Sequence, residues 1–238
     1  MKKVLIIQNC TLDGEGLLKE VLTTHNISYD IIHFDKKHEF PLLQKYSAIF
    51  SFGGPDSAND QTSKMLLEIA YVKEALKRNI PFLGICLGLQ VLVKAAGGKV
   101  VKNPIKELGF KDEMGKPYEV VLTEQGLQDP LCQGLPPFFR TLELHGETVE
   151  LTDAMTLLAS GSHCINQIVK VAPKVYGTQF HSELTPEMMK AWISKDSDLQ
   201  SSNAQAMLHE FKAMQPTYAQ VGKKLFINFL KLSSLLSC

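Results

Sequence analysis

Apolar and polar residues follow two distinct patterns in the first part of the chain. Short apolar runs, with the length and residue types of buried strands, occupy residues 4–9, 27–34, 48–52 and 81–85. Amphipathic stretches, with apolar residues at helical spacing, occupy residues 17–22, 64–77 and 87–96. Strands that alternate with helices in this way predict an α/β fold, with a mainly parallel open sheet and helices on both faces.

Beyond Gly98 the pattern changes to short strand candidates separated by turn residues, which predict an antiparallel extension of the sheet. These candidates are residues 118–123, 139–144, 155–160, 164–171 and 174–180. Helical spacing returns at residues 186–193, 202–214 and 218–232. Because no repeat or low-complexity linker divides the chain, we expect a single domain over residues 1–238, with residues 186–238 as a C-terminal helical extension.

Charge and cysteine content argue against several classes of function. The 25 basic and 25 acidic residues give zero formal net charge, and so provide no field that would gather nucleic acid or anionic lipid. Acidic residues interrupt the lysines between Lys99 and Lys116, which we interpret as a solvated face. No apolar stretch is long enough to span a membrane. The five cysteines are widely spaced and lack a C-x-x-C pair, which favours a cytoplasmic protein without disulfides or a zinc ribbon.

The segment PFLGICLGLQ, residues 81–90, carries the most specific chemical signal. An apolar strand leads directly into a helix through the pattern G-x-C-x-G, formed by Gly84, Cys86 and Gly88. This is the nucleophile-elbow pattern with cysteine in place of serine. The turn places the sulfur at a helix N-terminus, where the dipole favours the thiolate and exposed N–H groups can bind an oxyanion. A buried structural cysteine beside a tight turn is the alternative interpretation.

A base for this thiol follows another predicted strand. Residues 175–180 deliver His181 and Glu183 to the carboxyl end of the sheet, where α/β proteins collect their catalytic groups. A thiol needs a base, and the base needs a carboxylate to orient it. A His-x-Glu pair on one side of an extended segment supplies both. The alternative is an ordinary surface pair at the end of a strand.

A third segment, SFGGPDSAND at residues 51–60, also follows a predicted strand. Its Gly53–Gly54 pair lets a backbone amide approach a ligand closely, although the same residues suit an ordinary turn before a helix. The pattern S-x-G-G-x-D-S resembles the phosphate loop of ATP pyrophosphatases, but Pro55 lacks an N–H group to offer a phosphate. The glycines after Asp13 do not complete a dinucleotide motif, and the histidines lack metal-ligand spacing. We therefore expect no cofactor and no metal.

Taken in this order, GGPDS, GICLGLQ and TQFHSE make the chain resemble the class I glutamine amidotransferases. The resemblance covers about residues 1–190, and ELGF at 107–110 and HGE at 145–147 also fit it. Within the family, the chain most resembles the free-standing members that are similar to the amidotransferase part of GMP synthase. The resemblance implies the flavodoxin-like architecture of this family, and a thioester between a triad cysteine and the γ-acyl group of glutamine.

The resemblance also implies roles for individual residues. Cys86 would be the nucleophile, His181 the general base and acid, and Glu183 the group that orients His181. The backbone amides of Gly54 and Leu87 would form the oxyanion hole. Residues that would hold the substrate are Gln90, Leu144, His145 and Gly146.

Three functions are compatible with this resemblance. The first is a glutaminase that supplies ammonia to a separate synthetase subunit, since the chain has no acceptor-activating domain of its own. The second is a γ-glutamyl peptidase that uses the same thioester chemistry on glutathione-like compounds. Leu144, which stands where relatives often carry Asn or Ser, keeps this possibility open. The third is a non-catalytic relative that binds a partner, and the intact Cys–His–Glu set argues against it.

Overall fold

The computed structural model describes residues 3–34, 36, 40–200 and 204–237 of the chain. Its strands are β1 (Lys3–Gln8), β2 (Ser28–His33), β3 (Ala48–Ser51), β4 (Phe82–Ile85), β5 (Lys99–Gly109), β6 (Glu119–Leu122), β7 (Phe138–Arg140), β8 (Glu143–Glu150), β9 (Thr156–Ser160), β10 (Ile168–Ala172) and β11 (Val175–Thr178). Its α-helices are α1 (Gly16–Thr24), α2 (Ser63–Lys77), α3 (Leu87–Ala95), α4 (Glu124–Gln128), α5 (Pro186–Lys195), α6 (Ser197–Gln200) and α7 (Ala204–Leu232). None of these helices is apolar over a length that could cross a membrane.

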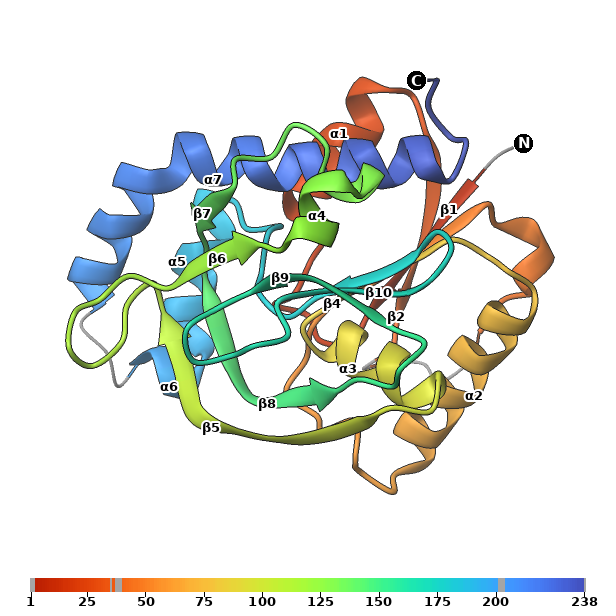
Figure 1. Cartoon of the computed structure of the whole chain (residues 1–238), viewed down its shortest axis with the longest axis horizontal. Coiled ribbons are helices and arrows are strands. Elements are labelled where there is room, and N and C mark those ends of the chain that lie inside the picture. Colours follow the sequence, from red (N-terminus) through yellow and green to blue (C-terminus); the bar gives the residue numbers. More distant parts are fainter. Residues whose placement is uncertain (1–2, 35, 37–39, 201–203, 238) are drawn as a thin grey trace.

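In the described part of the chain, nine strands form one sheet in the order β2-β1-β3-β4-β11-β10-β9-β6-β7 (Figure 1). The strands from β2 to β11 are parallel to one another. Every residue of β3, β4 and β11 is buried, because helices cover both faces of this half of the sheet. The predicted α/β fold with a parallel, helix-covered sheet is confirmed.

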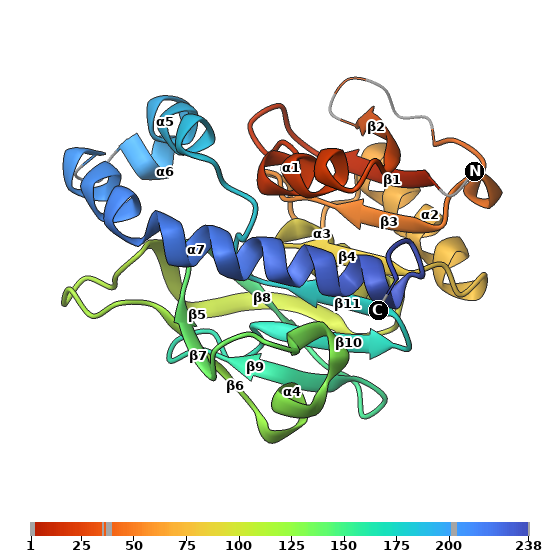
Figure 2. The same cartoon turned by 90° about the horizontal axis from the view of Figure 1, so that it is seen from above.

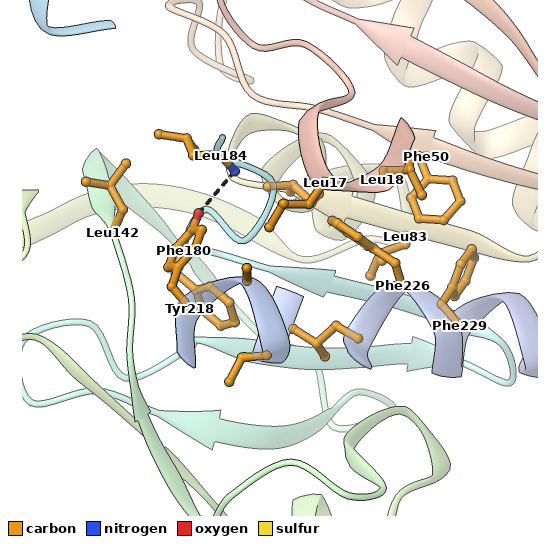
Figure 3. Packing of buried hydrophobic residues seen from close by; sticks show 14 of the residues in the cluster. Leu17, Leu18, Phe50, Leu83, Leu142, Phe180, Leu184, Tyr218, Phe226 and Phe229 are labelled. Carbon is orange, nitrogen blue, oxygen red and sulfur yellow. Dashed lines mark hydrogen bonds between the residues drawn. The ribbon is translucent and has the colours of Figure 1, made fainter. Parts of the chain in front are cut away.

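The two faces of the parallel sheet bury two separate apolar clusters. Along β1, Val4 and Ile6 belong to one cluster while Leu5 and Ile7 belong to the other, as the alternation of a strand requires. Helices α1 and α7 cover the first face, and α2 and α3 cover the second (Figure 2). On the first face, Phe226 and Phe229 of α7 pack edge-on against Phe50 of β3, with ring centroids 5.9 and 4.9 Å away (Figure 3).

The remaining strands extend the sheet and add a second one. Strands β10, β9, β6 and β7 continue from β11 in antiparallel order, as predicted. Strands β5 and β8 pair with each other in a separate two-stranded sheet. The three lysines of β5, Lys99, Lys102 and Lys106, are exposed, in agreement with the predicted solvated face. Their pattern does not predict the strand on which they lie.

Two of the predicted strands have different bounds. The candidate at 139–144 is two strands, β7 and β8, because Leu142 between them leaves the sheet to pair with His181. The candidate at 164–171 begins only at Ile168, and Cys164 lies in an irregular segment before it. In both cases apolar runs continue through a turn, so the run is longer than the strand.

The C-terminal segment also differs from its prediction. The two helices expected at 202–214 and 218–232 are one helix, α7, which continues through Pro216. Residues 202 and 203 of the first one lie outside the described residues. Proline removes one backbone hydrogen bond within a helix and favours a bend there. Buried residues on both sides of it, Met214 and Tyr218, hold the two halves of α7 against the same core.

Candidate active site

Cys86 lies at the sharp turn between β4 and α3. Its backbone has φ 53° and ψ −109°, which is strained for a residue with a side chain. The turn is tight because the backbone of α3 lies directly against β3 and β4. A Cβ atom on Gly88 would be 2.1 Å from the carbonyl oxygen of Ser51, and one on Gly84 would be 2.3 Å from that of Gly88. The pattern G-x-C-x-G is therefore a steric requirement of this elbow.

His181 and Glu183 follow β11, which pairs with β4 in parallel register. The backbone N–H of Cys86 donates to the carbonyl of Thr178 at 2.8 Å, so the two strand ends are fixed to each other. The ring Nδ1 of His181 lies 2.6 Å from Oε1 of Glu183, and Oε2 of Glu183 accepts from the N–H of Ser182 at 2.8 Å. With Nδ1 occupied by the carboxylate, Nε2 is the nitrogen that remains for chemistry.

The charges around His181 favour its protonated form. Burial opposes the imidazolium, but the charges of Glu183 and Cys86 and hydrogen bonds to both raise the pKa of His181 well above its ordinary value. Both side chains of the His181–Glu183 pair are almost fully buried. The Cys86 thiol also lies 3.8 Å from the carbonyl oxygen of Leu144 and 3.8 Å from Nε2 of Gln179. The structure thus brings Cys86, His181 and Glu183 together as the sequence predicts.

Gly54 and Leu87 lie on adjoining segments beside Cys86. A Cβ atom on Gly54 would be 3.2 Å from the Leu87 side chain and 2.9 Å from Cβ of Asn9. Leu87 is the first residue of α3, and an N–H group at that position has no partner within the helix. Both residues line the same cavity as Cys86. This is a suitable place for two backbone donors that face an oxyanion.

The four residues expected to hold substrate all line this cavity. The side-chain Nε2 of Gln90 donates to the carbonyl of Glu147 at 3.1 Å and to Oε1 of Gln179 at 3.4 Å, so it ties the elbow helix to β8. The ring of His145 is held by protein groups on both nitrogens: Nδ1 is 3.0 Å from the carbonyl of Glu147, and Nε2 is 3.0 Å from Glu143. We therefore expect the backbone of Leu144, His145 and Gly146, rather than the His145 ring, to face a substrate.

A second carboxylate, besides that of Glu183, lies beside the triad, and no sequence motif indicates it. Asp13, in the loop after β1, is buried and lines the cavity. Its Oδ2 and the His181 ring carbon Cε1 lie 2.6 and 3.0 Å from the point that a Cβ on Gly53 would occupy. Burial raises the pKa of Asp13 to about 7, the nearby His181 lowers it, and Glu183 and Asp196 raise it further. The surrounding letters, DGEG, resemble only an incomplete nucleotide motif and do not indicate a buried acid.

Trp192 of α5 also contacts His181, and no sequence motif indicates this contact. Its ring meets the His181 ring edge-on, with centroids 4.8 Å apart, and its indole N–H donates to the carbonyl of Leu12 at 2.7 Å. This contact covers the His181 ring from the side of the C-terminal helices. Helical spacing predicts that Trp192 is buried, but no local pattern indicates that it packs on His181.

The cavity that contains these residues has a volume of about 620 Å³, within the usual range for a small-molecule site. The triad and the oxyanion candidates lie in it, and it extends to Lys106 on β5 and to residues 195–198 of α5 and α6. The pocket is thus lined by residues from the edge of the large sheet, from the two-stranded sheet of β5 and β8, and from helices α5 and α6.

Among the described residues, Glu107, His145 and Cys164 are close enough to share a metal ion, with ligand atoms within 4.8 Å of one another. Protein contacts already account for these groups. His145 Nε2 lies 3.1 Å from Glu107 and 3.0 Å from Glu143, and the Cys164 thiol lies 3.2 Å from the hydroxyl of Thr148. The cluster is a buried network of ion pairs and hydrogen bonds that supports β8.

Comparison with known proteins identifies the family. Residues 10–199 match the family model for "Glutamine amidotransferase class-I". The chain belongs to the class I glutamine amidotransferase family. It is 28% identical over 193 residues to the glutamine amidotransferase-like protein YfeJ of Salmonella typhimurium, with 78% of each chain covered. It is 31% identical over 144 residues to a glutamine-hydrolysing GMP synthase subunit of Sulfolobus acidocaldarius, and the match covers 60% of this chain and 70% of that relative.

Longer relatives and solved structures agree with this assignment. The GMP synthase of Thermosipho melanesiensis is 29% identical over 180 residues, and the match covers 73% of this chain but only 32% of that enzyme. A glutamine amidotransferase from Thermotoga maritima superposes with a TM-score of 0.83 over 96% of this chain and 98% of its own, at 24% identity. A glutamine amidotransferase from Methylobacillus flagellatus gives 0.85 at 23% identity, over 98% and 95% of the two chains. At such identities the structures show the shared fold.

Proposed function

We propose that this protein hydrolyses the side-chain amide of glutamine through a thioester on Cys86 and releases ammonia. The observation that carries the proposal is the position of Cys86: a strained elbow at a helix N-terminus, beside a His181–Glu183 pair with a 2.6 Å contact. The cavity around it is large enough for glutamine. Family membership supports the same chemistry.

The first half-reaction forms the acyl-enzyme. The sulfur of Cys86, with its proton transferred to Nε2 of His181, attacks the amide carbon. The carbonyl oxygen becomes an oxyanion, which the N–H groups of Gly54 and Leu87 stabilise. The C–N bond then breaks, His181 gives its proton to the leaving nitrogen, and ammonia departs. Glu183 keeps the ring in the orientation and tautomer that both transfers need.

The second half-reaction regenerates the thiol. Water attacks the thioester carbon while His181 accepts a proton from it, and the same two N–H groups stabilise the second oxyanion. The C–S bond breaks, glutamate leaves, and the proton returns to sulfur. This sequence needs no metal or redox step.

We further propose that the ammonia passes to a separate synthetase subunit. The name of the Sulfolobus relative describes a subunit of GMP synthase, and that protein aligns with 60% of this chain. The name of the Salmonella relative gives no acceptor for ammonia, whereas that of the Sulfolobus relative refers to GMP synthesis. The proposal therefore names a synthetase partner but no particular acceptor.

A second candidate substrate is a γ-glutamyl amide with a larger leaving group. The cavity continues past the triad to Lys106 and to the residues around Asp196, which provides room and charge beyond what ammonia needs. The chemistry would be the same, with an amine in place of ammonia as the leaving group.

Mass spectrometry and product analysis would test both candidate substrates, glutamine and a γ-glutamyl amide. The purified protein is mixed briefly with glutamine or with a γ-glutamyl dipeptide, quenched in acid and digested. A γ-glutamyl adduct on the Cys86 peptide, together with ammonia or the free amino acid, is the expected result. Cys86→Ala serves as the blank, and an adduct-free wild-type protein that turns over neither substrate would contradict the proposed function.

A further inference from the structure

The segment from His181 to Leu184, called here the catalytic segment, lies outside any helix or regular strand after β11. Its conformation therefore depends on contacts with other elements. On the sheet side, the N–H of His181 donates to the carbonyl of Leu142 at 3.0 Å, and the Thr141 hydroxyl donates to the carbonyl of His181 at 3.0 Å. On the α1 side, the N–H of Leu17 donates to the carbonyl of Glu183 at 2.8 Å.

The third set of contacts comes from α7, and it centres on one hydroxyl group. The OH of Tyr218 donates to the carbonyl of His181 at 3.0 Å and accepts from the N–H of Leu184 at 3.2 Å. It thus bridges the two ends of the catalytic segment. Figure 3 shows the bond to Leu184. Tyr218 is only 3% exposed, and burial raises its pKa well above its ordinary value, so the donor proton is retained.

One turn further along α7, Gly222 brings the helix against the same segment. A Cβ atom at this position would lie 2.1 Å from the carbonyl oxygen of Ser182, which no real side chain permits. Tyr218 and Gly222 are four residues apart and so share a face of the helix. The packing of Phe226 and Phe229 on Phe50 holds this face in register over the sheet.

We propose that α7 is a positioning element for the triad, and that the Tyr218 hydroxyl and the backbone contact at Gly222 fix the catalytic segment so that His181 points at Cys86. The proposal rests on the proposed function for the chemistry of the triad. Helix α7 begins at Ala204, beyond residues 10–199 that match the family model. The positioning contact thus comes from a part of the chain that the family model does not include. Tyr218 acts through His181 and does not itself contact the reacting atoms.

Tyr218→Phe is the direct test, because it removes both hydrogen bonds and keeps the ring. A displacement of a catalytic group by about 1 Å can lower the rate about a hundredfold, so we expect kcat to fall about ten- to a hundredfold with little change in KM. Tyr46→Phe is the matched control, because it also removes a hydroxyl from a buried tyrosine. Tyr46 belongs to the other apolar cluster, and its hydroxyl donates to Asp30 at 2.8 Å. Gly222→Ala should lower kcat further if it folds.

A second measurement separates positioning from general destabilisation. The rate at which iodoacetamide labels Cys86 is followed against pH by peptide mass spectrometry, at a temperature where circular dichroism finds every variant folded. Close to the thiol, the titratable groups are His181, Glu183, Asp13, Asp196, His145 and the thiol of Cys10. The cavity is also lined by the charged residues Asp56, Lys106, Glu147, Lys195 and Asp198. We expect the profile of Tyr218→Phe to move toward that of His181→Ala, and the profile of Tyr46→Phe to match wild type.

The outcomes distinguish the two proposals. A Tyr218→Phe variant that keeps wild-type kcat and the wild-type labelling profile overturns the positioning role, even if it is less stable. If the wild-type protein turns over no glutamine or γ-glutamyl compound but the labelling profile still shifts, the proposed function fails and the positioning role stands. If Tyr46→Phe shifts the profile as much as Tyr218→Phe, the effect is nonspecific and the positioning role is again overturned.

Discussion

Two buried histidines lie close to Cys86, and each has a glutamate two residues away in sequence. His181 is paired with Glu183 at 2.6 Å, and His145 with Glu143 at 3.0 Å. The difference lies in the second ring nitrogen. That of His181 faces the Cys86 thiol. In His145 both nitrogens contact protein oxygens: Nδ1 lies near the carbonyl of Glu147, and Nε2 near Glu143 and Glu107.

This difference decides what each ring can do. A ring with one nitrogen held and one facing a nucleophile can move a proton between partners. A ring with both nitrogens held can only carry a fixed charge. Burial opposes the charge on His145, but the two carboxylates raise its pKa to about 10. His145 therefore stays protonated near neutral pH, where it anchors the Leu144–Gly146 backbone beside the cavity.

The largest expected effect tests the assignment of chemistry to the His181 side. Cys86→Ala removes the nucleophile and should lower kcat by at least about 10⁴-fold, to the level set by binding and the oxyanion donors. Cys132→Ala, a buried cysteine in another part of the core, is the control and should keep near-normal turnover. Steady-state release of ammonia measures both. Substantial activity in Cys86→Ala would show that Cys86 is not the nucleophile, and His181 would then have no distinct role beside it.

The next prediction compares the two carboxylates. Glu183→Gln should lower kcat about 10³-fold, because the amide no longer stabilises the imidazolium or fixes its tautomer. The loss should be smaller than that of His181→Ala, which deletes the base. Glu143→Gln should change kcat by less than about tenfold, since its imidazole moves no proton. Equal losses of kcat in the two variants, measured on fully folded protein, would mean that the two pairs do not differ in role.

The sequence predicts the His181–Glu183 pair better than the His145–Glu143 pair, and the reason is physical. The triad comes from two local patterns, an elbow around Cys86 and a His-x-Glu at a strand end, and the topology of parallel strands brings them together. The His145 cluster joins β5 to β8, and the pairing of those strands leaves no local periodicity that a single sequence reveals. Likewise, neither Asp13 nor Tyr218 belongs to a motif, and only tertiary packing places them beside His181.

Boundaries were harder to predict than elements. The parallel strands follow from unbroken apolar runs, and the elbow helix follows from apolar residues at helical spacing. By contrast, lysines on the exposed side of β5 suggested a solvated surface, and Pro216 suggested a break that packing overrides in α7. Cys10 is a related case: it directly follows the apolar run predicted as a buried strand at residues 4–9, yet it is partly exposed and lines the cavity. Because an electrophile in the cavity can reach both thiols, labelling should be measured on the peptide that contains Cys86.

A third prediction addresses the structural histidine. His145→Gln leaves the carboxylates of Glu143 and Glu107 buried without their cation, a loss that typically costs about 3–5 kcal/mol of folding free energy. Urea unfolding followed by fluorescence at neutral pH measures it. We also expect a higher KM for glutamine, because the Leu144–Gly146 backbone loses its anchor, with kcat of the folded protein changed by less than about tenfold. A variant as stable as wild type would show that the ion pairs contribute nothing net.

The smallest effect concerns a buried carboxyl group that has no histidine bonded to it. Glu68 on α2 accepts from the side chains of Asn9 at 3.0 Å and Ser51 at 3.2 Å, behind the Gly54 loop. Burial raises its pKa from 4.5 to about 7, against the lowering effect of the two hydrogen bonds and of Lys64. The folded protein therefore keeps this proton over a range where the unfolded chain has lost it. Stability should fall as pH rises from about 4.5 to about 7, by at most about 3 kcal/mol in total.

Substitution of this carboxyl group tests the prediction directly. Glu68→Gln cannot ionise, so its stability relative to wild type should be near zero at pH 4.5 and should rise to a plateau above pH 7. Glu74→Gln, at a half-exposed position on the same helix, should give a difference that does not grow with pH. Thermal unfolding from pH 4.5 to 8.5 measures both variants. If the advantage of Glu68→Gln stayed constant across this range, Glu68 would be ionised throughout. The hydrogen bonds from Asn9 and Ser51, with the charge of Lys64, would then be enough to support a buried carboxylate.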